Sequence, residues 1–239
     1  VRGDGVFEVI RVYEGRPYAL REHLDRIERS IANLRLTGTP DRAVLEREAR
    51  ELLEARGGSA FDGALRIMLT GGGHRILITE PLPPTAERAR LAYVTYAPTR
   101  LLDGVKSLSY AANMLASRIA RDRGFDEALL VTPHGRVLEA PTSSLFYVNE
   151  RGELCTPPLD DHILASITRA RVIDLTGAVE RVTTGDDLLG AREAFLASTT
   201  REVQSVSAIE DRDLGPMGER TRQAADLLHK DIQAALDGA

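Results

Sequence analysis

Pro98-Thr99-Arg100-Leu101-Leu102-Asp103-Gly104 interrupts the pattern of the chain, and Val105-Lys106-Ser107-Leu108-Ser109-Tyr110 follows it. The first stretch lacks periodicity and carries turn-forming residues, which predicts an interdomain connection over 98–104. Helical and strand patterns alternate on both sides of it, so we expect a mixed α/β protein with two lobes. A small N-terminal lobe would cover 1–97 and a larger lobe 105–239. Lys106 would then lie at a cleft between lobes, where small-molecule sites usually form.

The first half predicts a hairpin followed by two helices and three strands. Val, Ile, Phe and Tyr are frequent over 6–12, and a turn at 14–16 leads back into 17–20. Apolar residues at helical spacing predict an amphipathic helix over 22–35. Thr39-Pro40 reads as an N-cap followed by proline at the first helical position, with the helix ending near Arg56. Strands are predicted over 64–70, 75–80 and 91–97.

The second half opens with a predicted strand that carries Lys106. Helices are expected over 111–123 and 167–175, with a terminal helix from about 217. The strands we expect lie over 127–132, 136–140, 144–148, 194–198 and 202–209.

Composition excludes several classes of protein. The 239 residues are 43% hydrophobic and 28% charged, as in an ordinary globular chain. A net charge of −5 with interspersed signs argues against a nucleic-acid surface. No apolar run has the length of a membrane span, and no signal-peptide pattern opens the chain. The single Cys155 cannot form an intrachain disulfide, so we expect a cytoplasmic protein without a metal site.

Lys106 is unusual because only two of the 31 basic residues are lysines. Arginine cannot replace a lysine that must lose its proton and attack a carbonyl, since its pKa is too high. Lys106 is therefore the candidate for a covalent, Schiff-base role. The alternative is a lysine at a strand end whose amine reaches water. Lys230 follows His229 in a polar helix and is expected to be a surface charge.

A lysine that holds an aldehyde cofactor needs a nearby anchor for a phosphate. Ser166-Ile167-Thr168 begins a predicted helix and offers unpaired amides and a hydroxyl. Thr199-Thr200 forms a second hydroxyl corner at a strand end, and Arg26 lies on an early helix. Each has a simpler interpretation: hydroxyls at a helix start are often only N-caps, and Arg26 could be a surface cation.

The ring nitrogen of such a cofactor stays protonated only if a carboxylate lies close to it. Glu139 is an acid within an apolar predicted strand, where an unpaired charge would be costly. It could equally be a strand-end residue that faces water. Tyr110 lies four residues after Lys106, so an extended segment would place both on one face, with the phenol able to reach the cofactor.

These segments together resemble the class IV (fold type IV) pyridoxal-phosphate aminotransferases. The resemblance extends over essentially the whole chain in several ordered blocks. The residues of this chain that resemble each motif of the family are 3–8 for GDGVFE, 23–27 for HLxRL, 106–110 for the segment with the lysine, 126–129 and 137–139 for DEAL…G.V.E, 156–159 for TPPL, and 163–169 for ILxGITR.

The resemblance implies pyridoxal 5′-phosphate as cofactor, with Lys106 as its Schiff-base residue. It implies phosphate contacts from Arg26, Ser166, Ile167, Thr168 and Thr199, a ring-nitrogen contact from Glu139, and a cofactor contact from Tyr110. It also implies a homodimer with shared active sites, and an N-terminal hairpin that this sequence lacks. Ala140, Ser144 and Ser166 depart from the family's glycine and asparagine positions without removing the chemistry.

The expected substrates are an amino acid and a 2-oxo acid, such as glutamate with 2-oxoglutarate or alanine with pyruvate. We expect substrate contacts from Phe7 and Thr200, and from Arg2 and Arg66, whose guanidinium groups suit a carboxylate. Arg2 could instead be only part of a frayed terminus. The opening block favours a D-amino-acid transaminase. The alternatives are a branched-chain L-amino-acid transaminase, an aminodeoxychorismate lyase, and a degenerate binding subunit without activity.

Overall fold

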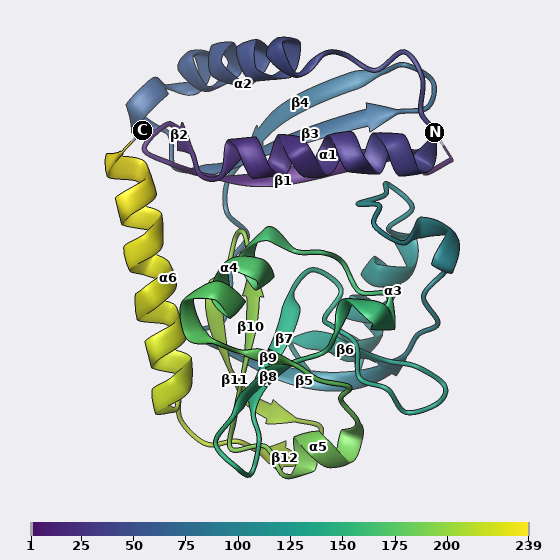
Figure 1. Ribbon diagram of the computed structural model, residues 1–239, viewed down its shortest axis with the longest axis vertical. Helices are drawn as coiled ribbons and strands as arrows, with labels where there is room; N and C mark the ends of the chain where they lie inside the picture. Colours follow the sequence, from purple (N-terminus) through teal and green to yellow (C-terminus); the bar gives the residue numbers. More distant parts are fainter. Residues whose placement is uncertain (1, 239) are drawn as a thin grey trace. The chain divides into compact units, whose positions relative to one another are not determined.

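The computed structural model describes residues 2–238, which form two compact α/β units (Figure 1). Unit 1 contains residues 2–84, 104–110 and 232–238, and unit 2 contains residues 85–103 and 111–231. The expected α/β class is confirmed. The division differs from the predicted lobes at three places, one of which is the end of the chain, where 232–238 belong to unit 1. Strand β5 (Arg88–Thr95) belongs to unit 2 because it pairs with strands there, and the Lys106 segment belongs to unit 1 because it bonds to β1 (Gly5–Tyr13).

Unit 1 is built on a four-stranded antiparallel sheet with the order β2-β1-β3-β4. Strand β2 is Arg16–Pro17, β3 is Gly63–Thr70 and β4 is Arg75–Glu80. Helix α1 (Leu20–Leu34) packs on β1, and α2 (Arg42–Arg56) packs on β4 (Figure 1). The predicted hairpin, the first helix and these strands are thereby confirmed. The β1 residues are almost all buried, so this strand forms the centre of the unit's core.

The start of α2 differs from the prediction. Its N-cap is Asp41, and the helix begins at Arg42, two residues beyond Pro40. Thr39 and Pro40 therefore belong to the connection between the helices, and the short helix η1 (Gly58–Ala60) follows α2. The C-cap glycine Gly57 has a φ of 132°, which a side chain would disfavour, and this explains why the helix ends at Arg56 as predicted.

Unit 2 is built on an eight-stranded mixed sheet with the order β6-β5-β11-β10-β7-β8-β9, and β12 pairs with β11. The strands predicted over 91–97, 127–132, 144–148, 194–198 and 202–209 are confirmed. The remaining strands are β6 (Glu127–Val131), β7 (Ser144–Val148), β8 (Leu154–Thr156), β9 (Val179–Glu180), β10 (Glu193–Ser198), β11 (Glu202–Ile209) and β12 (Arg212–Asp213). Parallel pairs join β5 to β6 and β11, whereas β7, β10 and β11 are antiparallel neighbours.

The helices of unit 2 cover this sheet. Helix α3 (Ala111–Asp122) packs against β5 and β6, and α4 (Ile167–Thr176) packs against β10. The remaining helical segments are η2 (Arg100–Leu102), η3 (Leu159–Asp161), α5 (Gly185–Leu189) and α6 (Glu219–Asp237), whose last turns belong to unit 1. Stacked rings of Phe146 and Phe195, 4.9 Å apart, lie on adjacent strands of the sheet. Among the described residues, no helix is both long and apolar enough to span a membrane.

Two predicted strands are not regular strands. Around Lys106 the structure has only an isolated bridge between Val6 and Ser107, and residues 136–140 form isolated bridges instead of a ladder. Both segments run beside a strand for only a few residues, so they gain hydrogen bonds without the regular alternation of a ladder.

Candidate active site

Lys106 lies in unit 1 beside the first residues of β1. The backbone amide of Phe7 donates to the Lys106 carbonyl at 3.0 Å, and the Lys106 amide donates to Ser30 Oγ at 3.1 Å. The half-buried amine lies 4.6 Å from the centroid of the Phe7 ring. The main chain on both sides of the lysine is therefore fixed, and one side of the amine is covered by an aromatic ring.

A second aromatic ring, that of Tyr110, also lies near this amine. Its ring centroid lies 5.9 Å from Lys106 Nζ and 5.3 Å from the centroid of Phe7, with the two rings nearly perpendicular. The structure therefore brings together three of the predicted residues, Phe7, Lys106 and Tyr110. Their proximity arises differently from the prediction, because the Tyr110 amide donates to Leu108 O at 2.8 Å in a tight turn instead of continuing a strand.

Arg26 belongs to a fully buried charge cluster in the same unit. Its Nε and Nη2 each donate to a different oxygen of Glu8 at 2.6 Å, and His23 Nδ1 lies 2.7 Å from Glu8 Oε2. Glu8 is completely inaccessible to solvent, and Arg26 and His23 are nearly so. The interpretation of Arg26 as a surface cation is therefore wrong. Its guanidinium is oriented by a carboxylate that lies in the middle of β1.

The electrostatics of this cluster keep Glu8 ionised and His23 neutral. Burial alone would raise the pKa of Glu8, but the hydrogen bonds and charges of Arg26 and His23 outweigh it and lower that pKa to about 2. Burial lowers the pKa of His23, and the charges of Arg26 and Lys106 lower it further against the opposing effect of Glu8. His23 therefore donates its Nδ1 proton to Glu8 as a neutral imidazole.

Sequence reasoning missed Glu8 and His23 as functional candidates. Glu8 carried a usable signal, since it is the one acid in an otherwise apolar run over 6–10. A buried carboxylate is costly unless a cation and hydrogen bonds compensate it, which should have linked Glu8 to a neighbouring arginine.

The two arginines proposed for a substrate carboxylate have different surroundings. The Cζ atom of Arg66 on β3 lies 5.8 Å from the centroid of the Phe7 ring, which also lies beside the Lys106 amine. Its Nε and Nη2 both donate to Glu80 Oε2, at 2.9 and 2.8 Å. Arg2 is exposed. Arg66 is therefore placed near Phe7 with its charge already matched by a carboxylate on the neighbouring strand.

Glu139 lies in unit 2, beside β6. Its Oε1 accepts a hydrogen bond from the Leu164 amide at 3.0 Å, and backbone bonds join Leu130 to Glu139 and Leu138. Burial raises the pKa of the Tyr96 phenol, and the charge of Glu139 raises it further, so the two groups are neighbours. The half-buried carboxylate is thus held in place by a backbone amide, so its position as a hydrogen-bond acceptor is fixed.

The start of α4 has the geometry of an anion cradle. Ser166 is its N-cap, and the Ser166 hydroxyl accepts from the Arg169 amide at 3.2 Å, as the simpler interpretation expected. The amides of Ile167 and Thr168 come before the first helical hydrogen bond, so no carbonyl of the helix can accept from them. Thr168 is buried there. Helix N-termini of this kind bind phosphate through their amides and the helix dipole.

Buried hydroxyls surround the second predicted corner, Thr199-Thr200, which joins β10 to β11. Ser143, Ser144 and Ser198 are buried, and their side-chain oxygens have no hydrogen-bond partner within residues 2–238. Ser144 pairs with Ala197 in the β7–β10 ladder, so these serines lie at the end of the strands that leads into the corner. Unsatisfied buried hydroxyls are uncommon and suit a polar ligand or bound water.

The arrangement offers three kinds of chemistry. Unit 1 provides an amine held against aromatic rings, and unit 2 provides a fixed carboxylate together with helix amides and hydroxyls. Within the described residues, no group of His, Cys, Asp and Glu side chains could hold a metal ion. Each group by itself suits one feature of an organic cofactor: an amine can bond to a carbonyl carbon, a carboxylate can accept from a protonated ring nitrogen, and amides and hydroxyls can bind a phosphate.

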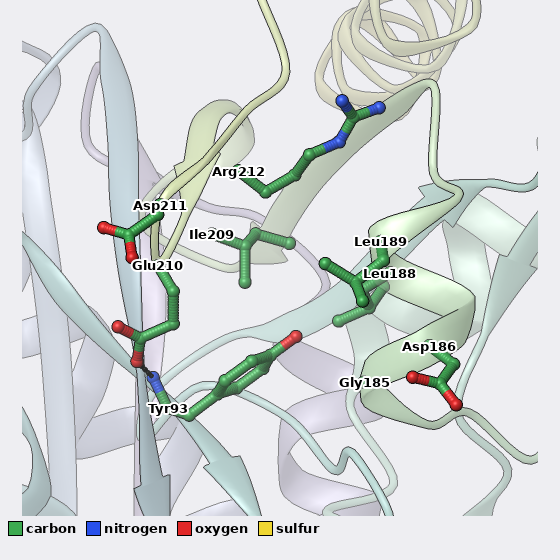
Figure 2. Close-up of a pocket in the computed structure, with 9 residues that line it drawn as sticks. All are labelled: Tyr93, Gly185, Asp186, Leu188, Leu189, Ile209, Glu210, Asp211 and Arg212. Carbon is green, nitrogen blue, oxygen red and sulfur yellow. Dashed lines mark hydrogen bonds between the residues drawn. The ribbon is translucent and has the colours of Figure 1, made fainter.

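A separate pocket of about 300 Å³ lies on unit 2 and contains none of the predicted site residues (Figure 2). Tyr93 points its hydroxyl into it, opposite Leu188 and Leu189 of α5 (Figure 2). Burial raises the pKa of Tyr93 to about 12, helped by the charges of Glu210 and Asp186. The phenol therefore stays protonated at neutral pH, and nothing in this pocket resembles the amine chemistry of unit 1.

Comparison with known proteins gives consistent matches along the chain. The family described as amino-transferase class IV matches residues 5–209. A D-alanine aminotransferase from Bacillus licheniformis is 31% identical over 258 residues, covering 99% of this chain and 88% of the relative. An aminodeoxychorismate lyase from Bacillus subtilis is 27% identical over 251 residues, covering 95% of this chain and 85% of the relative.

A solved structure gives the same result for the fold. The fold IV-transaminase from Curtobacterium pusillum is 30% identical and superposes with a TM-score of 0.82, covering 95% of this chain and 85% of that one. The predicted fold type is therefore confirmed.

Proposed function

The chain belongs to the class IV aminotransferase family, whose enzymes depend on pyridoxal phosphate, and we propose that it transfers an amino group between a D-amino acid and a 2-oxo acid. The observation that carries the proposal is the position of the Lys106 amine, 4.6 Å from the Phe7 ring on a backbone fixed from both sides. The likeness to a D-alanine aminotransferase supports the choice of enantiomer.

We assign the cofactor contacts as follows. Lys106 would carry the cofactor, and the Glu139 carboxylate would accept a hydrogen bond from its protonated ring nitrogen. The amides of Ile167 and Thr168, with the hydroxyls of Ser166, Thr168 and Thr199, bind the phosphate, and Arg26 adds a positive charge. Tyr110 contacts the cofactor ring. The fit rests on the unpaired helix-start amides, the unsatisfied hydroxyls before Thr199, and the amide-bound carboxylate of Glu139.

When bound, pyridoxal phosphate withdraws electrons from the α-carbon of an amino acid. The chain's own residues then have distinct tasks. Lys106 Nζ takes the proton from the α-carbon, because a neutral amine close to the substrate can act as a general base. Phe7 and Tyr110 exclude water from one side of that amine. Arg2, Arg66 and Thr200 are the proposed contacts to the substrate.

A donor screen tests the proposal. The purified chain is incubated with pyridoxal phosphate, 2-oxoglutarate or pyruvate, and either D-alanine, L-leucine or D-glutamate, and the new amino acid is measured. We expect transfer from the D-amino acids. Transfer from L-leucine without transfer from D-alanine would contradict the D-specificity and favour the branched-chain alternative.

The lyase alternative has its own observation in its favour, the likeness to an aminodeoxychorismate lyase along 95% of the chain. Pyruvate release from aminodeoxychorismate in the absence of a 2-oxo acid distinguishes it from transamination. A chain that binds pyridoxal phosphate but reacts with none of these compounds would instead support the degenerate binding subunit.

We also propose that the chain works as a homodimer in which each site receives Arg2 from the partner. The exposure of Arg2 is compatible with a role outside its own subunit. Sedimentation at micromolar concentration should give twice the monomer mass, and a fully active monomer would contradict this assembly.

A further inference from the structure

Arg201 follows the Thr199-Thr200 corner directly and anchors it to a buried carboxylate. Its Nη2 donates to Glu127 Oε2 at 2.6 Å, and its Nη1 donates to Gln204 Oε1 at 3.0 Å. The Glu127 side chain is 4% exposed and the Arg201 side chain 18%. Such a charge-assisted pair is stronger than an exposed one, because little water competes for either partner.

The carboxylate at the centre of this anchor is itself fixed. Glu127 is the first residue of β6, and its Oε1 accepts from Ser117 Oγ of α3 at 2.7 Å. On the other side, Gln204 Nε2 donates to the Ala86 carbonyl at 2.5 Å. The guanidinium of Arg201 is therefore held between two side chains that cannot move independently of the fold of unit 2.

The same guanidinium also contacts the Glu139 loop, which consists of residues 140–142. Thr142 Oγ1 lies 3.5 Å from Arg201 Nη2, and Asn113 Nδ2 of α3 donates to the Pro141 carbonyl at 3.2 Å. This loop adjoins Glu139, the proposed ring-nitrogen contact, and the corner contains Thr199, one of the proposed phosphate contacts of unit 2. Arg201 directly follows the corner in sequence, and its side chain contacts Thr142 of the loop.

The backbone just after the corner is strained at Glu202, so contacts are needed to hold it. Glu202, the residue after Arg201, has a φ of 54°, in the left-handed region that side chains disfavour. Backbone in this region persists when surrounding contacts determine it, and it is frequent at functional sites. Arg201, the residue next to Glu202, is held by its side-chain bonds to Glu127, Gln204 and Thr142.

We propose that Arg201 is a positioning residue, which fixes the Thr199-Thr200 corner relative to the Glu139 loop and thereby sets the affinity for cofactor and substrate. The proposal rests on the proposed function, because it assigns those two segments to the cofactor and the substrate. Arg201 acts through Glu127, Thr142 and the corner, and no chemical step on the substrate is assigned to it.

A matched control exists in the same unit. Arg123 and Glu210 form another arginine–glutamate pair with an N–O distance of 2.6 Å, but their side chains are 44% and 27% exposed. Glu210 lies at the separate pocket of Figure 2 and contacts none of the proposed site segments. Arg123→Gln removes the same chemical pair without touching the corner or the Glu139 loop.

The experiment compares Arg201→Gln, Arg201→Lys, Glu127→Gln and Arg123→Gln with the wild-type holoenzyme. The dissociation constant of pyridoxal phosphate is measured by fluorescence, KM and kcat are measured with the best donor, and folding is followed by thermal melting. For Arg201→Gln we expect the dissociation constant and KM to rise about tenfold with a smaller change in kcat, as for the loss of one charge-assisted hydrogen bond. Glu127→Gln should change them in the same direction, and Arg201→Lys should restore part of the loss.

Arg123→Gln should leave both constants at the wild-type value. An Arg201→Gln protein that melts cooperatively with unchanged cofactor affinity and KM would overturn the proposal, as would equal effects from Arg123→Gln. If Arg201→Gln does not fold, Arg201→Lys against Arg123→Gln decides the same question. A wild-type chain that binds pyridoxal phosphate but transfers no amino group would overturn the proposed function alone, because the cofactor affinities still test Arg201.

Discussion

Unit 1 and unit 2 hold their candidate site groups in contrasting ways. In unit 1, Lys106 lies near a solvent-free cluster of Glu8, Arg26 and His23, in which each charge depends on the others. In unit 2, the proposed phosphate contacts are neutral: helix-start amides and hydroxyls such as that of Thr168. Removing a buried charge leaves another uncompensated, whereas removing one hydroxyl leaves its neighbours in place. Substitutions should therefore have large effects in the charge cluster of unit 1 and small ones among the neutral phosphate contacts of unit 2.

The largest effect is expected at the amine itself. Lys106→Ala should lower kcat/KM by roughly 10³-fold or more, since it removes both the covalent link and the general base. Steady-state kinetics with the best donor measures this change. Lys230→Ala serves as the control and should retain wild-type rates, because Lys230 lies in the exposed part of α6. Comparable losses from both variants would remove the basis for assigning chemistry to unit 1.

The next largest effect is expected at Glu8. Glu8→Gln leaves the buried Arg26 guanidinium without a counter-charge and should lower the free energy of unfolding by about 3–5 kcal/mol, measured by urea titration. Glu28 of α1 forms a partly exposed ion pair with Arg42 of α2, and Glu28→Gln should change stability little. A Glu8→Gln protein as stable as the Glu28→Gln protein would refute the contrast between the units.

The same cluster should make the free energy of unfolding decrease at acidic pH. The pKa of His23 is lowered below its ordinary 6.5, so the unfolded chain binds the extra proton first and stability falls as pH drops below about 6.5. Glu8 has its pKa lowered from 4.5 to about 2, so its contribution is present above 4.5 and is lost as pH falls towards 2.

His23→Gln separates these two contributions. The variant keeps a donor for Glu8 but has no imidazole to protonate, so its unfolding free energy should depend less on pH between about 6.5 and 4.5. Denaturant titrations at a series of pH values provide the measurement. An identical pH dependence in wild type and variant would show that His23 is not held neutral.

The smallest effect is expected from a single hydroxyl in unit 2. Thr168→Val should weaken pyridoxal phosphate binding only about fivefold, which corresponds to about 1 kcal/mol for one neutral hydrogen bond. Thr176 lies at the opposite end of α4, where its hydroxyl donates to the Val172 carbonyl, so Thr176→Val is the matched control. A loss of affinity for Thr168→Val much larger than fivefold would contradict the sharing of the phosphate among several neutral groups.

The regular elements could be predicted because their residues carry a period or a cap. Helix α1 follows from the spacing of Leu24 and Ile27, and α4 from Ser166 as its N-cap. Strands of two or three residues, such as β9, contain no period, so tertiary packing alone determines them. Helix α5 did carry a signal that was missed, a capping box between Thr184 and Asp187.

The groups of the candidate site differ in how visible they are in the sequence, for a related reason. Lys106, Glu139 and the start of α4 stand out within short segments of sequence. The pairing of Arg26 with Glu8 and of Arg66 with Glu80 joins residues 14 or more positions apart, so it depends on strand and helix placement that local patterns do not contain. The same holds for Arg201, whose partner Glu127 is 74 positions away.

Chemical labelling can identify which amine of the chain carries the cofactor. The chain contains two lysines, so borohydride reduction of the protein with pyridoxal phosphate, followed by peptide mass spectrometry, has two possible positive outcomes. We predict a stoichiometric pyridoxyl label on the peptide that contains Lys106. A label on Lys230, or no specific label on either peptide, would rule out Lys106 as the Schiff-base residue.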